Sequence, residues 1–157
     1  MKTIRNSLVL LAVFAVMASA AAHAELPMKK MLNLKVAKNI AAAAEKHAIA
    51  NKWNVAITIL DDGGNLLYFQ KMDGVQIGSI EVAHQKALSA LKFKRPTKVF
   101  SDGVDGGNSR YLSLPGAMPF EGGLPLMSGD QVVGSIGVSG VTAAQDGMIA
   151  AAGAKAL

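Results

Sequence analysis

Cysteine is absent from this chain of 157 residues. Its absence excludes disulfides, thiolate metal sites and catalysis by a thiol. Only three histidines are present, and the sequence contains no HExxH motif, no P-loop and no Gly-x-Ser-x-Gly elbow. Because no nucleophile with a partner base can be identified, we predict no catalytic residues and favour a binding protein over an enzyme.

A strong excess of one charge is also lacking. The chain has 16 Lys and Arg against 11 Asp and Glu, which gives a formal charge of +5. One basic cluster stands out, formed by Lys92, Lys94, Arg95 and Lys98. The other basic residues are scattered, so we predict no nucleic-acid partner, and we expect a weak basic patch that suits small anionic groups.

The apolar run near the N-terminus, Ser7–Ala18, is shorter than the about 20 residues that a membrane-spanning helix needs. It follows Lys2 and Arg5 and precedes a small-x-small site at Ala22–Ala24. We therefore predict a secretory signal peptide over residues 1–24 and a periplasmic or secreted protein. An uncleaved signal anchor is the alternative.

Cleavage would leave residues 25–157, a chain of 157 − 24 = 133 residues with a formal charge of +5 − 2 = +3. This length is that of one domain, and it suffices to bury a core without disulfides. Helical spacing predicts three helices, over residues 32–51, 79–92 and 142–157. Alternation and turn residues predict two hairpins, formed by strands 54–60 with 66–71 and 124–127 with 131–138.

Residues 101–123 hold six glycines and two prolines and are predicted to be an irregular loop that carries function or a partner contact. Gly134 and Gly137 lie inside a predicted strand, which indicates that a helix or a ligand approaches it closely. The order helix, hairpin, helix, loop, hairpin, helix predicts an α+β fold in which helices flank a central antiparallel sheet.

Five short motifs follow one another along the second half of the chain. They are Lys71-Met72-Asp73-Gly74, Lys86-Ala87 with Ala90 one turn later, Gly122-Gly123-Leu124-Pro125-Leu126, Val133–Gly140, and Gln145-Asp146. Their order and spacing resemble the GlcG/HbpS family of DUF336-type domains, which also forms the C-terminal domain of PduO-type adenosyltransferases. The resemblance covers residues 32–157. It implies a profilin-like fold, a haem or other tetrapyrrole ligand, and a homo-oligomer.

His84 is the first candidate for ligand binding. It lies in an apolar helical stripe made of Ile77, Ile80, His84, Leu88 and Leu91. An imidazole there is a candidate axial ligand to haem iron, with apolar walls beside it. The alternative is a core or interface histidine that is hydrogen-bonded to backbone. The family motif fixes Lys86 and Ala87 rather than His84, so the resemblance carries no ligand role over to it.

Other candidates come from the motifs and the loop. The resemblance places Met72 and Asp73 beside the ligand cleft, where Asp73 would orient Lys86 or a bound group; capping of the next helix is the alternative for Asp73. Lys86 would pair with a propionate, with Asp73, or lie on a solvated helix face.

Gly122 and Gly123 offer backbone N–H groups for an anion, or serve only a turn. Tyr111 and Phe120 supply part of an aromatic-lined pocket. His47, near the end of the first predicted helix, is explained by its interaction with the helix dipole.

The leading hypothesis is thus an exported protein that binds haem or another tetrapyrrole and acts in haem sequestration, trafficking or sensing. Two alternatives remain. One is a cofactor-free module that binds an exported or membrane sensor through its alanine-rich helices. The other is an accessory protein of small hydroxy-acid utilisation, which the resemblance suggests because family members lie in such pathways.

Overall fold

The structure, a computed structural model, describes residues 25–157, so the predicted signal peptide lies outside the described residues. A four-stranded antiparallel sheet with strand order β2-β1-β4-β3 forms its centre. The elements are α2 (Leu34–Ala50), β1 (Ala56–Asp61), β2 (Leu66–Lys71), α3 (Gly78–Phe93), α4 (Lys98–Asp105), the 3-10 helix η1 (Ser109–Ser113), β3 (Gly123–Ser128), β4 (Gln131–Ser139) and α5 (Ala143–Ala154). The predicted α+β architecture is confirmed.

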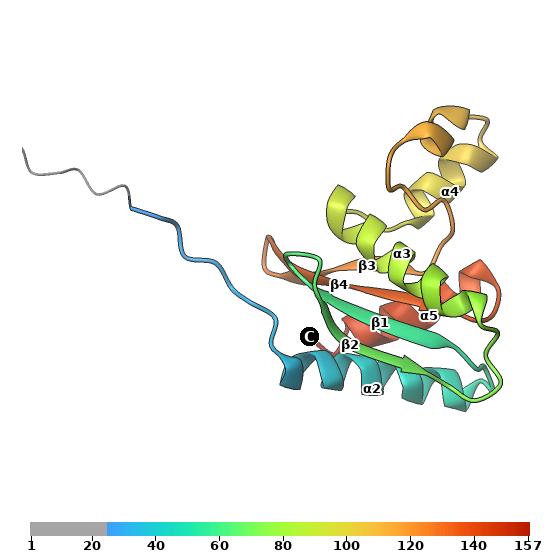
Figure 1. The fold of residues 1–157 in the computed structure, drawn as a ribbon, viewed down its shortest axis with the longest axis horizontal. Helices are drawn as coiled ribbons and strands as arrows, with labels where there is room; N and C mark the ends of the chain where they lie inside the picture. Colours follow the sequence, from blue (N-terminus) through green and yellow to red (C-terminus); the bar gives the residue numbers. More distant parts are fainter. Residues whose placement is uncertain (1–24) are drawn as a thin grey trace, which may run out of the picture.

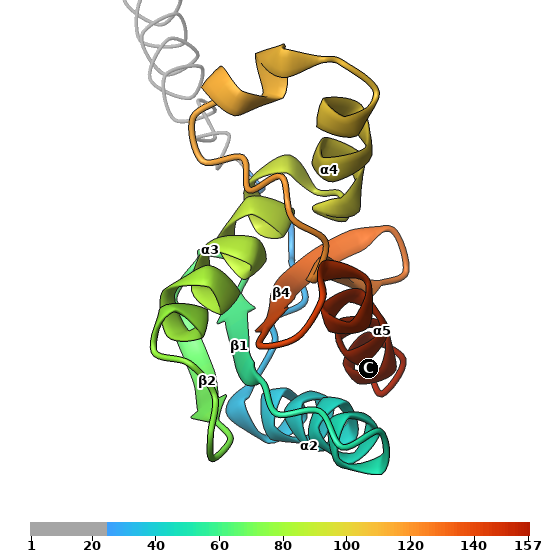
Figure 2. The same cartoon turned by 90° about the vertical axis from the view of Figure 1, so that its right-hand side faces the viewer.

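Helices cover both faces of the sheet (Figure 1). The helices α2 and α5 pack side by side on one face, and α3 lies on the other, as the rotated view in Figure 2 also shows. The short elements α4 and η1 extend beyond the end of α3. Within residues 25–157, no helix has the length and apolar character needed to cross a membrane.

Two helices begin at side-chain caps. The side chain of Asn33 accepts the N–H of Val36 at the start of α2. Thr142 and Gln145 form a capping box at the start of α5. Such caps satisfy backbone donors that have no partner inside the helix, and they fix where each helix begins.

The face of the sheet covered by α2 and α5 holds the larger core. Val55, Ile57 and Ile59 are fully buried there, as their alternation predicted. Gly153 of α5 lies so close to α2 that a Cβ would be 3.0 Å from the carbonyl oxygen of Ile40. The alanines that α2 presents to this core are fully buried, namely Ala37, Ala41, Ala44 and Ala48. They are therefore used inside the domain and are not available to a partner protein.

The opposite face is covered by the alanine side of α3. Ala83 and Ala87 lie over Gly137 of β4, where a Cβ would be 2.0 Å from the Ala83 carbonyl oxygen and 2.5 Å from the Ala87 nitrogen. The predicted close approach of a helix or a ligand is confirmed at Gly137, where α3 makes it, whereas at Gly134 the neighbours are the Leu60 carbonyl of β1 and the Leu32 side chain. Because small residues line the contact, α3 sits deep on the sheet, and its larger apolar residues are displaced to its outer flank.

The prediction of an irregular loop over residues 101–123 was wrong for its first half, which contains the end of α4 and η1. The elements α4 and η1 form a small lobe, the α4 lobe. Phe100, which is 1% exposed, lies at its centre. It makes edge-to-face contacts with Phe93 and Tyr111, with ring centroids 5.1 and 5.3 Å apart. Tyr111 packs directly on Gly103. The glycine that suggested a loop is thus a contact surface for an aromatic ring, and one aromatic triplet stabilises two short helices.

Candidate functional site

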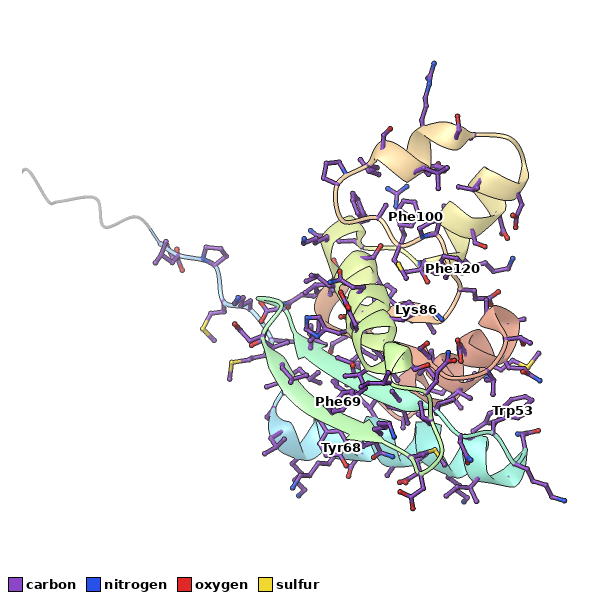
Figure 3. All side chains as sticks on the ribbon, turned by 45° about the vertical axis from the view of Figure 1, so that its right-hand side comes forward. Trp53, Tyr68, Phe69, Lys86, Phe100 and Phe120 are labelled. Carbon is purple, nitrogen blue, oxygen red and sulfur yellow. The ribbon has the colours of Figure 1, made fainter. Side chains whose placement is uncertain are left out.

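A buried ion pair joins two motifs that are far apart in the sequence. Lys86 of α3 donates to a carboxylate oxygen of Asp146 in α5 at 2.7 Å, and both side chains are 3% exposed. The Lys86 ammonium also donates to the carbonyl oxygen of Val138 at 3.1 Å. The second carboxylate oxygen of Asp146 accepts the N–H of Val141 at 3.2 Å. The pair therefore ties α3, β4 and α5 together; Figure 3 labels Lys86 on α3.

The environment of Asp146 opposes its ionisation. Burial raises the pKa of the Asp146 carboxyl above its ordinary value, and the Lys86 ammonium and the N–H groups of Val141 and Gly140 offset only part of this effect. Removing both charges of an ion pair from water has a large desolvation cost. The attraction between the two charges offsets this cost only when their geometry is good. Perturbed buried carboxyls of this kind are concentrated at functional sites.

Gly122 and Gly123 are needed because the chain passes directly over this pair. A Cβ on Gly122 would lie 2.9 Å from the Lys86 ammonium nitrogen, and one on Gly123 would lie 2.2 Å from the Lys86 carbonyl oxygen. Both residues are buried, and the N–H of Gly123 donates to the hydroxyl of Thr97 at 2.9 Å. The N–H of Gly123 is therefore already paired, and the glycines serve close packing rather than the predicted open anion nest.

A pocket of about 200 Å³ opens beside the ion pair. Lys86, Asp146 and Ser139 form its polar part. Apolar side chains complete the lining, among them Val82, Met118, Phe120 and Val141. Phe120 is 55% exposed, so it stands at the rim of the pocket. The structure thus brings the predicted residues Lys86 and Phe120 to one site, whereas Tyr111 packs in the α4 lobe.

In the sequence Asp146 was noted only as part of the Gln145-Asp146 motif, and its partnership with Lys86 was missed. The prediction that Asp73 orients Lys86 was wrong, because Lys86 is bound by Asp146. The prediction that Asp73 caps the next helix was also wrong: α3 begins after Ile77 without a side-chain cap, and Asp73 is exposed in the preceding turn. Met72 packs between the two hydrophobic clusters of the domain.

The outer flank of α3 forms a second region of interest. The predicted apolar stripe lies here rather than against the sheet: Ile77 is 84% exposed and Ile80 is 37% exposed. His84 is partly exposed in the same stripe, with Ile80 and Leu88 one turn away on either side. Leu88 and Leu91 lie over the β1–β2 turn, close to Gly64. We name this region, residues 77, 80, 84, 88 and 91, the α3 outer flank.

At one end of the outer flank lies a cavity of about 620 Å³, within the range of about 300–1,000 Å³ that small-molecule sites occupy. Leu88 and Leu91 supply its apolar side, and Lys29, Lys92 and Lys94 are among its polar residues. Asp62 and Asp130 also line it, and Asp62 forms an ion pair with Lys29. The basic cluster noted in the sequence thus contributes two lysines to a cavity.

The segment before α2 helps to close this cavity. The backbone N–H of Lys30 donates to the side-chain oxygen of Gln131 at 3.1 Å, and the Gln131 amide donates back to the Lys30 carbonyl at 3.1 Å. Lys29 binds Asp62 in the other hairpin turn. The segment therefore crosses both hairpin turns and fixes Lys29 at the cavity.

Among residues 25–157 there is no group of three or more His, Asp or Glu side chains that could hold a metal ion. His47 lies in the last turn of α2, as predicted, with its ring 6.1 Å from that of Trp53. The two histidines of the described chain therefore lie on different helices, and only His84 adjoins an open apolar surface.

Comparison with known proteins identifies the family. Residues 32–155 match the family model described as "Haem degrading protein HbpS-like". The chain is 36% identical to Protein GlcG of Escherichia coli K12 over 111 residues, which is 71% of this chain and 83% of that protein.

Solved structures agree with this match. An HbpS structure from Streptomyces reticuli aligns with a TM-score of 0.77 and 29% identity, covering 88% of this chain and 94% of that one. A PduOC:heme complex aligns with a TM-score of 0.74 and 26% identity, covering 82% and 96%. The predicted fold is confirmed by these neighbours, and the chain belongs to the HbpS-like (DUF336) family.

Proposed function

We propose that this protein binds haem on the α3 outer flank, as an exported protein that acts in haem sequestration, trafficking or sensing. Family membership supports a tetrapyrrole ligand, because one structural neighbour is a haem complex. The single observation that carries the site is His84, a partly exposed imidazole in the middle of an apolar stripe. Haem needs this combination of an iron ligand and an apolar surface for the porphyrin.

The lysines at the end of the stripe suit the other part of the ligand. Haem carries its propionates on one edge; Lys92 lies about two turns beyond His84 along α3, and Lys94 follows at the C-cap of the helix. They would bind the propionates as charge-assisted partners, while Leu88 and Leu91 contact the porphyrin. When bound, haem would supply its iron for ligand or electron chemistry. The residues of this chain would orient it and shield one of its faces.

The pocket beside Lys86 is a poorer candidate for haem. Its volume of about 200 Å³ is below the lower limit of about 300 Å³ for clefts that enclose drug-sized ligands. Haem is larger than such ligands, so the pocket beside Lys86 would at most contact one of its edges. The open outer flank has no such limit, and its apolar residues would be covered further if a second copy packed on it. Self-association as a homo-oligomer is therefore part of the proposal.

The test is a haemin titration of the purified protein, followed by the Soret band and by light scattering after size exclusion. We expect saturation at one haem per chain or per dimer. The variant His84→Ala should shift the Soret band and weaken binding at least tenfold, while the matched variant His47→Ala should match wild type. A spectrum that is unchanged in His84→Ala would exclude His84 as the iron ligand, and a non-saturating titration of wild type would exclude the proposed function.

A charge reversal tests the propionate contact separately. Lys92→Glu/Lys94→Glu should weaken haem binding by about tenfold, because two exposed charge contacts contribute up to about 1 kcal/mol each and tenfold corresponds to about 1.4 kcal/mol. The variant Lys35→Glu/Lys38→Glu on α2 carries the same change in net charge at exposed positions away from the cavity. Equal weakening in both variants would mean that only the net charge of the protein matters.

A further inference from the structure

We propose that the pocket beside Lys86 and Asp146 is a second binding site, separate from the haem site, for a small uncharged carbonyl compound with a short apolar tail. The ion pair does not use all the hydrogen-bonding capacity at the pocket. A lysine ammonium has three N–H donors, and Lys86 uses two of them, toward Asp146 and Val138. One donor on a side chain that is 3% exposed is therefore left for the pocket.

Ser139 provides a second unused polar group. It is 6% exposed, lines the same pocket, and its hydroxyl makes no hydrogen bond with the described residues. Lys86 and Ser139 both line the pocket, so a single acceptor placed there can accept from both donors. A carbonyl oxygen is such an acceptor, because it has two lone pairs and can accept from the ammonium and the hydroxyl together.

The charges at the pocket select against an anion. Asp146 already neutralises Lys86 at 2.7 Å, so the polar part of the pocket has no net charge. A ligand carboxylate would add a second negative charge beside Asp146 in a buried site, which is unfavourable without a further cation. The lysines of the basic cluster do not line this pocket. An uncharged amide, aldehyde or ketone avoids this repulsion, whereas a hydroxy acid does not.

The rim of the pocket fixes the other end of the ligand. Val82, Met118 and the exposed ring of Phe120 surround the opening. Small-molecule sites typically combine such apolar walls with a few converging polar groups. The pocket volume of about 200 Å³ restricts the ligand to a few carbon atoms beyond the carbonyl.

A matched pair of probes tests the proposal: isobutyramide, which is uncharged, and isobutyrate, which has the same shape and a negative charge. Each is titrated into ¹⁵N-labelled protein at neutral pH, and the amide signal of Val141, whose N–H binds Asp146, is followed. We expect a saturable shift with isobutyramide, with a dissociation constant of about millimolar order for so small a ligand, and at least tenfold weaker binding of isobutyrate.

Mild variants locate the site without breaking the ion pair. Ser139→Ala and Phe120→Ala should each weaken isobutyramide binding by about fivefold or more, while Ser101→Ala, a serine in α4, should not change it. Equal binding of the two probes would overturn the choice of an uncharged ligand. A shift that does not saturate, or one that survives both pocket variants, would overturn the site itself and leave water as the occupant of the pocket.

Discussion

At the scale of single residues, the Lys86–Asp146 pair is the most consequential interaction in the domain. Replacing Lys86 by Met keeps the length of the side chain but leaves the Asp146 carboxylate buried without its partner. We expect Lys86→Met to lower the free energy of unfolding by about 3–5 kcal/mol, the usual cost of breaking a buried pair. Urea denaturation followed by circular dichroism measures this change.

The double variant Lys86→Met/Asp146→Leu distinguishes a broken pair from lost packing. It removes both charges, so it should be more stable than Lys86→Met alone. The control is Lys98→Met, which removes an exposed i, i+4 pair with Asp102 and should leave the unfolding midpoint nearly unchanged. A double variant as unstable as the sum of its single variants would show that the two side chains contribute independently.

Asp61 gives the protein a predictable response to acid. Burial raises the pKa of its carboxyl, but hydrogen bonds from Asn65, Gly63 and Gly64 outweigh this effect and hold the pKa below the ordinary value of 3.8. A lowered pKa means that the stabilisation by Asp61 is fully present above about pH 4 and is lost as the pH falls through the folded-state value.

We therefore expect Asp61→Ala to be less stable than wild type by about 1 kcal/mol at pH 7. Below pH 3.8 the difference should shrink toward zero. Unfolding curves across the pH range measure this convergence. Asp130→Ala, in the other hairpin turn, is the control, because Asp130 makes no hydrogen bond with the described residues. A pH-independent difference at Asp61 would indicate a role in backbone geometry alone.

At the scale of elements, the contact between α3 and β4 depends on the absence of a side chain at Gly137. A Cβ there would lie 2.0 Å from a backbone oxygen of α3, so the helix would have to move away from the sheet. Gly137→Ala should lower stability by about 3 kcal/mol, at the upper end of overpacking costs. Gly78→Ala, where nothing lies within 4 Å, is the matched control and should be neutral or slightly stabilising. Thermal unfolding compares them, and equal melting temperatures would contradict the close contact.

The elements themselves follow from the sequence, whereas their orientation does not. Alternation and helical spacing predicted the two hairpins and three long helices to within a few residues, because local periodicity reflects burial directly. On α3 the alanines face the sheet and the larger side chains of Ile77 and Ile80 are exposed, and the apolar stripe alone does not show which side of the helix packs on the sheet.

The candidate site was predictable in part. Lys86 and the two glycines were identified through their motifs and Phe120 through its place in the predicted loop, but the function of each depended on a neighbour distant in the chain. Lys86 and Asp146 are 60 residues apart, and no periodicity relates them. The sequence left three alternatives for Lys86, namely a pair with a propionate, a pair with Asp73 or a solvated helix face, because lysines are almost never fully buried unless paired. Its burial becomes understandable only when the topology brings the first turn of α5 to the end of the sheet where Lys86 lies.

At the scale of the whole molecule, α3 separates two sites. His84 and Lys86 are two residues apart, which places them about 200° apart around the helix axis. One faces the outer flank, and the other faces α5 and the small pocket. Between them the alanine side of α3 is packed on the sheet without free space. Two sites divided by a rigid, close-packed element should bind their ligands independently, because coupling needs an element with two arrangements.

We therefore expect Ser139→Ala to leave haem affinity within about twofold of wild type. His84→Ala should leave isobutyramide affinity within the same limit. The reason is that the free-energy changes of substitutions at distant sites without shared partners add to within about 0.3–0.5 kcal/mol. Haemin and isobutyramide titrations of both single variants and of the double variant His84→Ala/Ser139→Ala give a complete double-mutant cycle for each ligand. A change of tenfold or more in either cross-measurement would mean that α3 shifts on the sheet when one site is altered. In that case the Lys86–Asp146 pair, which ties α3 to α5, would be the element that transmits the change.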